Sequence, residues 1–305
     1  DQHTMNTKQY LESVLEAQTL DSNGDELKKL RSRRREIREI LLSAYKSPKP
    51  SVRWAGSMSK TTMIRDSYDG DLTCYFDHDD EQAGKTLKEI YESVRDALSD
   101  DYLVEEKPSA LRILSRQKET KGEYTHINVV PGRFIEGNDG DVFLFRKSGD
   151  KSRLKTNLDV HIEHIRDSGV CDAIRLIKLW RFQNGLDHAK TFVLELLVVD
   201  ILENKKSLSL QSQLKHVWEE FRDHSASLSV KDPANPEGNA LKTQLDDCRD
   251  DLASVAKRTL KTIEDDGWEA VFGPVESETE EAKAAALHDA IRNVAVPNKP
   301  WLQRD

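Results

Sequence analysis

The spacing of apolar positions changes character about halfway along the chain. In the first half, helical spacing alternates with short runs rich in β-forming residues. The helical stretches are 7–20, 25–46 and Ala83–Leu98, and the β-rich runs are Val52–Ala55, Tyr102–Glu105, Leu111–Ser115 and Tyr124–Val130. From about Asn157 the pattern is helical, and Ser168–Phe182 and Thr191–Leu202 are apolar on nearly every side, which predicts buried helices. We expect an α+β fold of two lobes, with a mixed sheet and helices in residues 1–160 and a helical bundle in residues 161–305.

Composition excludes several classes of protein. With 305 residues, 37% of them hydrophobic, the chain is long enough to bury a substantial core. Its net charge of −9 argues against a general nucleic-acid coat protein, although a local basic channel stays possible. The cysteines, Cys74, Cys171 and Cys248, are too far apart for a zinc site and odd in number, which suggests a reducing, cytoplasmic environment. No signal peptide or membrane-length apolar run is present, so we expect no membrane partner.

The stretch Trp54–Phe76 carries the candidate chemistry. It reads as a short strand, a Gly56-Ser57 turn that opens a helical turn, and a second strand with Asp69 and Asp71. Side chains two apart on a strand point the same way, so these two carboxylates repel each other and need a divalent cation between them. Hard oxygen ligands suit Mg²⁺, which shares its coordination shell with substrate phosphates. Glycine allows close approach to a ligand, and N–H groups at a helix start form an anion cradle.

Two groups of cations leave alternatives open. The helix predicted over 25–46 carries seven of them, which are Lys28, Lys29, Arg31, Arg33, Arg34, Arg35 and Arg38. They form either a solvated, salt-bridged face or a contact for phosphate or nucleic acid. Arg175 and Lys178 lie three apart on a predicted buried helix, where a cation needs an anion. A nucleotide triphosphate is one candidate anion, and an ion pair with Glu195 or Asp200 is the other.

The motifs together resemble a known family. A Gly-Ser turn followed by Asp-x-Asp resembles the nucleotidyltransferases typified by DNA polymerase β. The runs LIKLWR (Leu176–Arg181), TFVLELL (Thr191–Leu197) and DPANPEGN (Asp232–Asn239) follow in that order. They resemble the branch that holds 2′-5′-oligoadenylate synthetase, cyclic GMP-AMP synthase and the bacterial CD-NTases, over roughly Val52 to Leu260. The resemblance implies a two-lobe nucleotidyltransferase with nucleotide bound in the cleft between a catalytic lobe and a helical lobe.

The resemblance also implies an activity and its partners. A ribose hydroxyl would attack the α-phosphate of a nucleoside triphosphate with the help of two Mg²⁺ ions. Repeated in one site, this reaction gives a cyclic or linear oligonucleotide second messenger, for which bacterial antiphage signalling is the natural setting. ATP, GTP or other nucleoside triphosphates would be substrates, and an effector or regulatory protein would be a further partner.

Site residues follow from the same resemblance. Asp69 and Asp71 would be catalytic and bind metal, and Gly56 and Ser57 would bind nucleotide. On the spine helix Lys178 would contact the donor triphosphate. The family has a Ser-Tyr pair at the positions of Thr191 and Phe192. Thr191 would contact phosphate, and Phe192 would stack on the donor base.

The third carboxylate of the family is replaced here. The matching run is Thr125–Pro131, and Asn128 stands at the aspartate position as the third catalytic and metal-binding residue. An amide offers a metal its carbonyl oxygen, but it has no negative charge and cannot accept a proton. We therefore expect binding of Mg²⁺–NTP with very slow turnover. Asn128 is either an introduced change of the kind used to trap a substrate complex, which we favour, or the residue of a natural pseudoenzyme.

Two other classes remain open. The first is an enzyme that extends an RNA 3′ end, as CCA-adding enzymes do. It would need a basic RNA track, and the Lys28–Arg38 segment is the one such track in the sequence. The second is a non-catalytic nucleotide-binding protein, which the amide at Asn128 allows.

Overall fold

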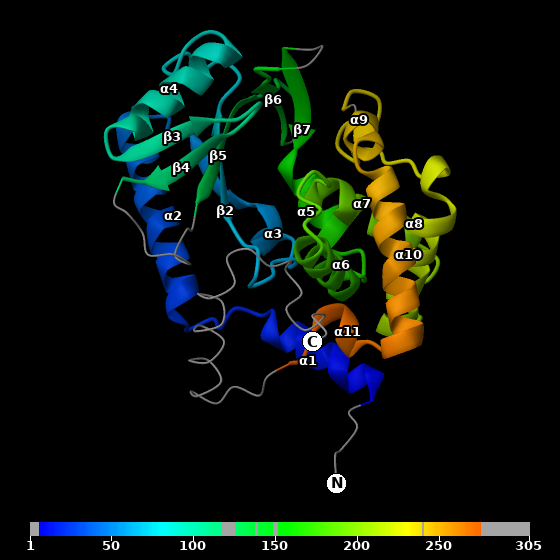
Figure 1. Cartoon of the computed structure of the whole chain (residues 1–305). Helices are drawn as coiled ribbons and strands as arrows, with labels where there is room; N and C mark the ends of the chain where they lie inside the picture. The colour runs from blue at the N-terminus through cyan, green and yellow to red at the C-terminus, as the bar shows by residue number, and fades with distance from the viewer. Residues whose placement is uncertain (1–5, 117–125, 138–139, 149–151, 240, 276–305) are drawn as a thin grey trace.

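The computed structural model describes residues 6–116, 126–137, 140–148, 152–239 and 241–275. These residues form two lobes that lie side by side, one built on a sheet and one built from helices (Figure 1). The α+β architecture predicted from the apolar pattern is confirmed.

A mixed sheet organises the first lobe. Its strand order is β1-β2-β5-β4-β3, and β6 pairs with β5 and β7. The pairing of β2 with β5 is parallel, and the other pairings are antiparallel. The strands are β1 (Ser51–Ala55), β2 (Gly70–Phe76), β3 (Tyr102–Glu106), β4 (Leu111–Ser115), β5 (Ile127–Phe134), β6 (Asp141–Phe145) and β7 (Arg153–Asn157).

The central strand β5 extends further at its C-terminal end than the sequence pattern predicted. The β-rich run was expected to stop at Val130, but the strand continues through Pro131 to Phe134. On one edge β5 pairs with β4 up to Val129 and with β6 from Arg133. Pro131 lies in the interval between these pairings, so its missing N–H breaks no bond to either strand. Tyr124 and Thr125, which the sequence assigned to this strand, lie outside the described residues.

Two helices cover one face of the sheet, α2 (Asp25–Ala44) and α4 (Leu87–Ser99), while a single short turn, α3 (Gly56–Ser59), follows β1. A capping box formed by Thr86 and Glu89 begins α4. The buried side of α2 recurs every three or four residues, as an amphipathic helix requires. Its members are Leu27, Leu30, Arg34, Ile37 and Leu41. An arginine therefore occupies one position of an otherwise apolar stripe.

The second lobe is a helical bundle. Its core contains the two helices that the sequence predicted as buried, α6 (Cys171–Gln183) and α7 (Thr191–Ile201). Trp180 and Trp218 pack with their ring centroids 6.0 Å apart, and the Trp180 indole donates to Thr259 Oγ1 at 2.8 Å. The surrounding helices are α5 (Leu158–Arg166), α8 (Leu210–Asp223), α9 (Leu241–Asp246), α10 (Arg249–Asp266) and α11 (Glu269–Phe272), with a 3₁₀ turn at Ser225–Ser227.

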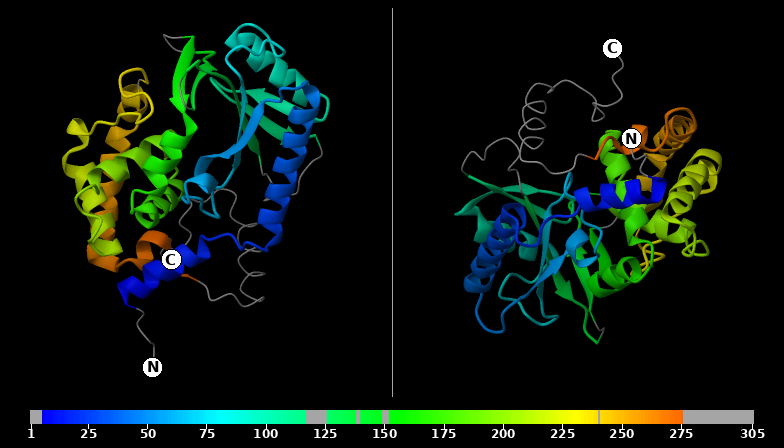
Figure 2. Two further views of the ribbon diagram at one scale, coloured as in Figure 1. Left: turned by 180° about the vertical axis from the view of Figure 1, so that it is seen from behind. Right: turned by 90° about the horizontal axis from the view of Figure 1, so that it is seen from below.

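The first helix, α1 (Thr7–Ala17), packs with the helical lobe and not with the sheet. Tyr10, Leu11, Val14 and Leu15 belong to the core that α6 and α8 share. The Tyr10 hydroxyl donates to the Gly273 carbonyl at 2.7 Å, and α1 lies beside α11 in each view (Figures 1 and 2). The division near residue 160 stays a proposal, and residues 7–17 belong by their packing to the second lobe.

The sequence also led to expectations about the cysteines and about membrane-spanning helices. The cysteines Cys74, Cys171 and Cys248 are free thiols. Within the described ranges, no helix is long and apolar enough to cross a bilayer.

Candidate active site

The acid pair and Asn128 meet on the two parallel central strands. Asp69 directly precedes β2, Asp71 is its second residue, and Asn128 is the register partner of Asp71 on β5. The Asn128 amide nitrogen donates to Asp69 Oδ2 and to Asp71 Oδ1, each at 3.0 Å. The structure thus brings together the three residues that the sequence put forward as the catalytic and metal-binding group.

The two carboxylates have unlike electrostatic surroundings. Burial raises the pKa of Asp69, but three neighbours lower it by more, so the pKa falls below its usual value. These neighbours are His126, whose Nε2 lies 3.6 Å from Asp69 Oδ2, Lys178 and Asn128. Burial and repulsion from Asp69 raise the pKa of Asp71 from 3.8 to about 6. At neutral pH both groups are therefore mainly ionised, and the second negative charge is held at a cost in free energy.

Gly56 sets how closely the turn approaches this pair. Its φ is +73°, and a Cβ at this position would lie 1.7 Å from Asp71 Oδ2. Only glycine fits such an approach in the left-handed region. Because α3 is four residues long, the anion cradle expected here consists of one turn of backbone N–H groups. So short a helix adds no appreciable macrodipole to the attraction of an anion. Ser57 is half-buried, and no described residue is a hydrogen-bond partner of its hydroxyl.

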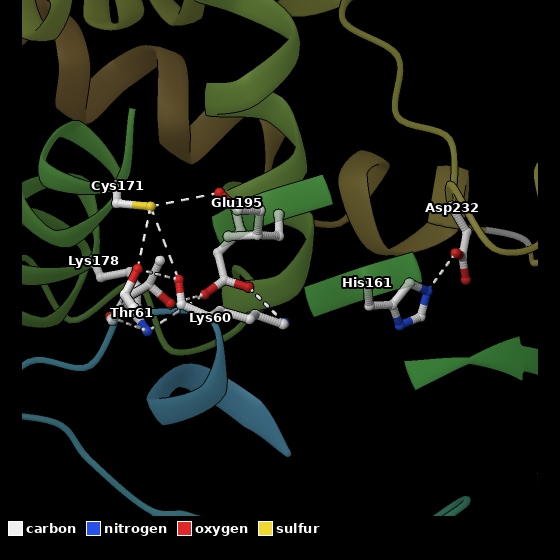
Figure 3. Close-up of polar contacts among 9 residues, drawn as sticks. Lys60, Thr61, His161, Cys171, Lys178, Glu195 and Asp232 are labelled. Atoms are coloured by element: carbon white, nitrogen blue, oxygen red, sulfur yellow. Dashed lines mark hydrogen bonds and ion pairs between the residues drawn. The ribbon is translucent and has the colours of Figure 1, made fainter. Parts of the chain in front are cut away.

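A buried carboxylate joins the turn to the helical lobe (Figure 3). Glu195 on α7 accepts from Lys60 Nζ at 2.8 Å and from Thr62 Oγ1 at 2.7 Å. Lys178 Nζ lies 3.5 Å from Glu195 Oε1 and donates to the Thr62 carbonyl at 2.8 Å. The two ammonium groups outweigh the effect of burial and hold the pKa of Glu195 below its usual value. Two lysines share one carboxylate here, and burial lowers the pKa of Lys178 against the attraction of Glu195.

Lys178 has the ion pair that the sequence left open as an alternative. Its side chain is 7% exposed, and Glu195 is the partner. The charged groups that act on Asp200, the other candidate, are His164 and Glu203. A contact of Lys178 with a triphosphate stays a prediction. Sequence reasoning missed Lys60, although it stands four residues after Gly56 and therefore one helical turn along the same side.

The two predicted base and phosphate contacts begin α7. Thr191 is exposed, and the Phe192 ring lies 4.8 Å from Lys60 Nζ and 4.7 Å from the His161 ring. His161 Nε2 in turn lies 2.6 Å from Asp232 Oδ1 (Figure 3). Asp232 is the first residue of the DPANPEGN run and is fully buried, so this motif anchors the wall against which Phe192 packs.

The donor set fits a hard divalent cation. Oxygens of Asp69 and Asp71 converge on one amide group, which places them around a common point. The amide presents its nitrogen to them, and the reverse orientation would present its oxygen to a metal. Among the described residues, no three His, Cys, Asp or Glu side chains form a metal cluster. In that reverse orientation Asn128 would add a third side-chain oxygen to those of Asp69 and Asp71.

The fold was compared with known proteins. No family model and no curated sequence matches the chain. CdnC of E. coli MS115-1, solved with HORMA-deltaN, is 18% identical with a TM-score of 0.63, over 88% of this chain and 97% of that one. Vibrio cholerae DncV cyclic AMP-GMP synthase, solved with a linear pppA(3′,5′)pG intermediate, is 14% identical with a TM-score of 0.64, over 85% and 90%.

Elizabethkingia meningoseptica CdnE cyclic dinucleotide synthase, solved with GTP and Apcpp, is 13% identical with a TM-score of 0.61, over 85% and 99% of the two chains. At these identities the likeness concerns the fold, and it covers both lobes. The chain therefore has the two-lobe fold of CdnC, DncV and CdnE, in agreement with the fold that the sequence resemblance implied.

Proposed function

We propose that this protein is a Mg²⁺-dependent nucleotidyltransferase that joins nucleoside triphosphates into a cyclic or linear oligonucleotide second messenger. The observation that carries the proposal is the meeting of Asp69, Asp71 and Asn128 on β2 and β5, with Gly56 against Asp71. Structures of this fold that were solved as cyclic dinucleotide synthases with nucleotides support the substrate class.

Each residue has a role in the proposed reaction. Asp69, Asp71 and the oxygen of Asn128 would hold Mg²⁺, which supplies charge stabilisation for the attacking and leaving oxygens. The Ser57 hydroxyl would donate to the triphosphate, and Lys60 would add positive charge from beside the turn. Thr191 would donate to phosphate, and Phe192 would stack on the donor base.

Asn128 limits the rate in this proposal. Its amide nitrogen donates to both carboxylates in the metal-free protein, and the amide would have to turn over to give its oxygen to Mg²⁺. It cannot accept the proton of an attacking hydroxyl, and it adds no negative charge to the metal site. The protein would accordingly bind Mg²⁺–NTP and release pyrophosphate very slowly.

Mixed NTPs with the Asn128→Asp variant test the proposal. We expect pyrophosphate release to rise by several orders of magnitude, since each tenfold corresponds to about 1.4 kcal/mol of barrier. Mass spectrometry of the products should show short cyclic or linear oligonucleotides. The matched control adds Asp69→Ala to the same variant and should remove all turnover.

The same assay with tRNA separates the other classes. Extension of the RNA at its 3′ end would make the protein an RNA nucleotidyltransferase. If the Asn128→Asp variant binds NTPs but turns none of them over, the protein is a non-catalytic nucleotide-binding protein. The proposal also includes a role in antiphage signalling and a regulatory protein as a partner. The complex of CdnC with HORMA-deltaN supports the regulatory partner.

A further inference from the structure

The DPANPEGN run contains a buried carboxylate to which the proposed reaction gives no part. Asp232 is fully buried. Its Oδ1 accepts from the Ala234 N–H at 2.8 Å and lies 2.6 Å from His161 Nε2, and its Oδ2 accepts from Asn239 Nδ2 at 2.7 Å. Burial raises the pKa of Asp232, but these three partners lower it by more, so the pKa falls below its usual value. The carboxylate is therefore ionised at neutral pH and can only accept hydrogen bonds.

This carboxylate fixes the tautomer of His161. Because Asp232 has no proton to donate, the proton of their shared hydrogen bond is on Nε2 of the imidazole. In the neutral imidazole Nδ1 then keeps a lone pair and is an acceptor. No described residue is a hydrogen-bond partner of Nδ1, and Nδ1 is not among the buried polar atoms that lack one, so solvent reaches it. This second nitrogen points away from Asp232 (Figure 3).

The acceptor lies beside the ring that is proposed to stack on the donor base. The ring centroids of His161 and Phe192 are 4.7 Å apart, and the two planes are inclined by 50°. Both side chains are partly exposed, that of His161 to 16%. Lys60 Nζ, from the turn beside the acid pair, lies 4.8 Å from the centroid of the Phe192 ring. A base that covers the open part of this ring would therefore come within reach of His161 Nδ1.

A purely structural role for His161 would be to join α5 to the DPANPEGN run. The run has another attachment, because Asn235 Nδ2 donates to the Lys155 carbonyl at 3.0 Å. The first turn of α5 is joined to β1 as well, through the two hydrogen bonds from Arg53 to Asp159. None of these contacts needs an open imidazole nitrogen, whereas contact with a ligand does.

We propose that His161 selects the base of the donor nucleotide, by accepting at Nδ1 a hydrogen bond from an exocyclic amino group of the base that stacks on Phe192. This role presupposes the binding of nucleoside triphosphates proposed above. An amino group projects beyond the ring edge and donates, whereas a carbonyl at the same position would direct its lone pairs at that of Nδ1. The site would consequently prefer adenine to hypoxanthine and cytosine to uracil. Asp232 is then a positioning residue, which acts through the tautomer of His161.

Calorimetry with Mg²⁺ at pH 8, where imidazole is mainly neutral, measures this preference with two pairs of nucleotides, ATP with ITP and CTP with UTP. Each pair differs by an amino group against a carbonyl at one ring position, and inorganic triphosphate is a probe without a base. His161→Gln keeps an amide N–H for Asp232 and removes the ring acceptor. The matched control is His224→Gln, which removes a histidine whose Nδ1 lies 3.0 Å from a carboxylate oxygen of Glu220 on α8.

We expect the parent and the control to bind the amino member of one pair or of both about tenfold more tightly than its carbonyl counterpart. In His161→Gln this preference should fall to within about twofold, while the affinity for inorganic triphosphate stays within about twofold of the parent's. A merely structural loss would instead weaken the binding of every probe to the same extent.

Equal affinities within both pairs in the parent would overturn the proposal, as would tighter binding of the carbonyl members. It is also overturned if His161→Gln keeps the parent's preference, or loses affinity equally for both members of each pair. If His161→Gln does not fold, ¹⁵N NMR of the parent with labelled histidine decides. One unprotonated histidine nitrogen should then shift with the amino member of a pair and not with its carbonyl counterpart, and the absence of such a signal overturns the contact.

The base preference and the turnover assay have separate outcomes. A preference that depends on His161 stands even if Asn128→Asp releases no pyrophosphate, in which case the protein recognises nucleotides without joining them. If the parent binds none of the probes, both the base contact and the proposed nucleotidyl transfer are refuted.

Discussion

Asn128→Asp should destabilise the metal-free protein, quite apart from its effect on turnover. In the structure one amide nitrogen donates to Asp69 and to Asp71 at 3.0 Å each. An aspartate has no such donor, and it would place a third carboxylate against two others. The change therefore removes two hydrogen bonds and adds repulsion in one step.

The size of the effect follows from those two bonds. A hydrogen bond to a charged group contributes about 1.5–3 kcal/mol, so losing both costs about 3–6 kcal/mol. For a chain of 305 residues each kcal/mol corresponds to about 1.6 °C, which predicts a melting temperature at least about 5 °C lower in EDTA. Mg²⁺ at a hundredfold excess over its Kd would return about 2.7 kcal/mol. Because a third carboxylate should bind Mg²⁺ with a lower Kd than the amide does, the melting temperature of Asn128→Asp should depend on Mg²⁺ more than that of the parent.

Thermal melts at pH 7.5, in EDTA and in Mg²⁺, measure both effects. Asn128→Ala loses the bonds without adding a charge, and Asn23→Asp adds a charge on an exposed loop, which should change little. The reasoning is refuted if Asn128→Asp melts within about 1 °C of the parent in EDTA, a shift too small for the loss of one such bond.

Three further predictions use the same melts and Mg²⁺–ATP binding. The raised pKa of Asp71 means that ionising this carboxyl lowers the stability of the folded protein, by an amount that grows between pH 3.8 and about 6. Asp71→Asn should therefore stabilise the metal-free protein by up to about 3 kcal/mol at pH 7.5 and lose that gain near pH 4. A lower melting temperature of this variant at pH 7.5 would contradict the prediction. Lys178→Met should destabilise by about 3 kcal/mol, and unchanged ATP affinity would assign the lysine to the Glu195 ion pair alone. Gly56→Ala should abolish ATP binding because its Cβ meets Asp71, whereas Gly185→Ala, also at positive φ but in open space, should retain it.

The sequence predicted those features that depend on local periodicity. The two-residue period placed Asp69 and Asp71 on one side of β2, and a buried cation at Lys178 was known to need an anion. Its partner Glu195 could be named only as one of two candidates, because the choice depends on how α6 and α7 pack. The partnership of Asn128 with both carboxylates depends on strand register, which no local pattern specifies.

Other features were present in the pattern but were not recognised. Arg34 falls on the same helical face as Leu30 and Ile37, yet it was counted only as one of seven cations on its helix. Lys60 stands one turn after Gly56 but has no neighbour in sequence that marks it. The docking of α1 on the helical lobe was not predictable either, because its apolar face fits any hydrophobic surface.

The placement of α1 has a consequence for how the chain folds during synthesis. Residues 25–157, which hold the whole sheet, form one continuous segment inserted between α1 and α5. The sheet lobe can therefore complete its core as soon as β7 has left the ribosome. The helical lobe cannot, because α1 precedes the sheet in the chain and its partners α6, α8 and α11 follow it. Until then Tyr10, Leu11, Val14 and Leu15 have no core to enter, and closing that core joins the two ends of the described chain around a finished sheet.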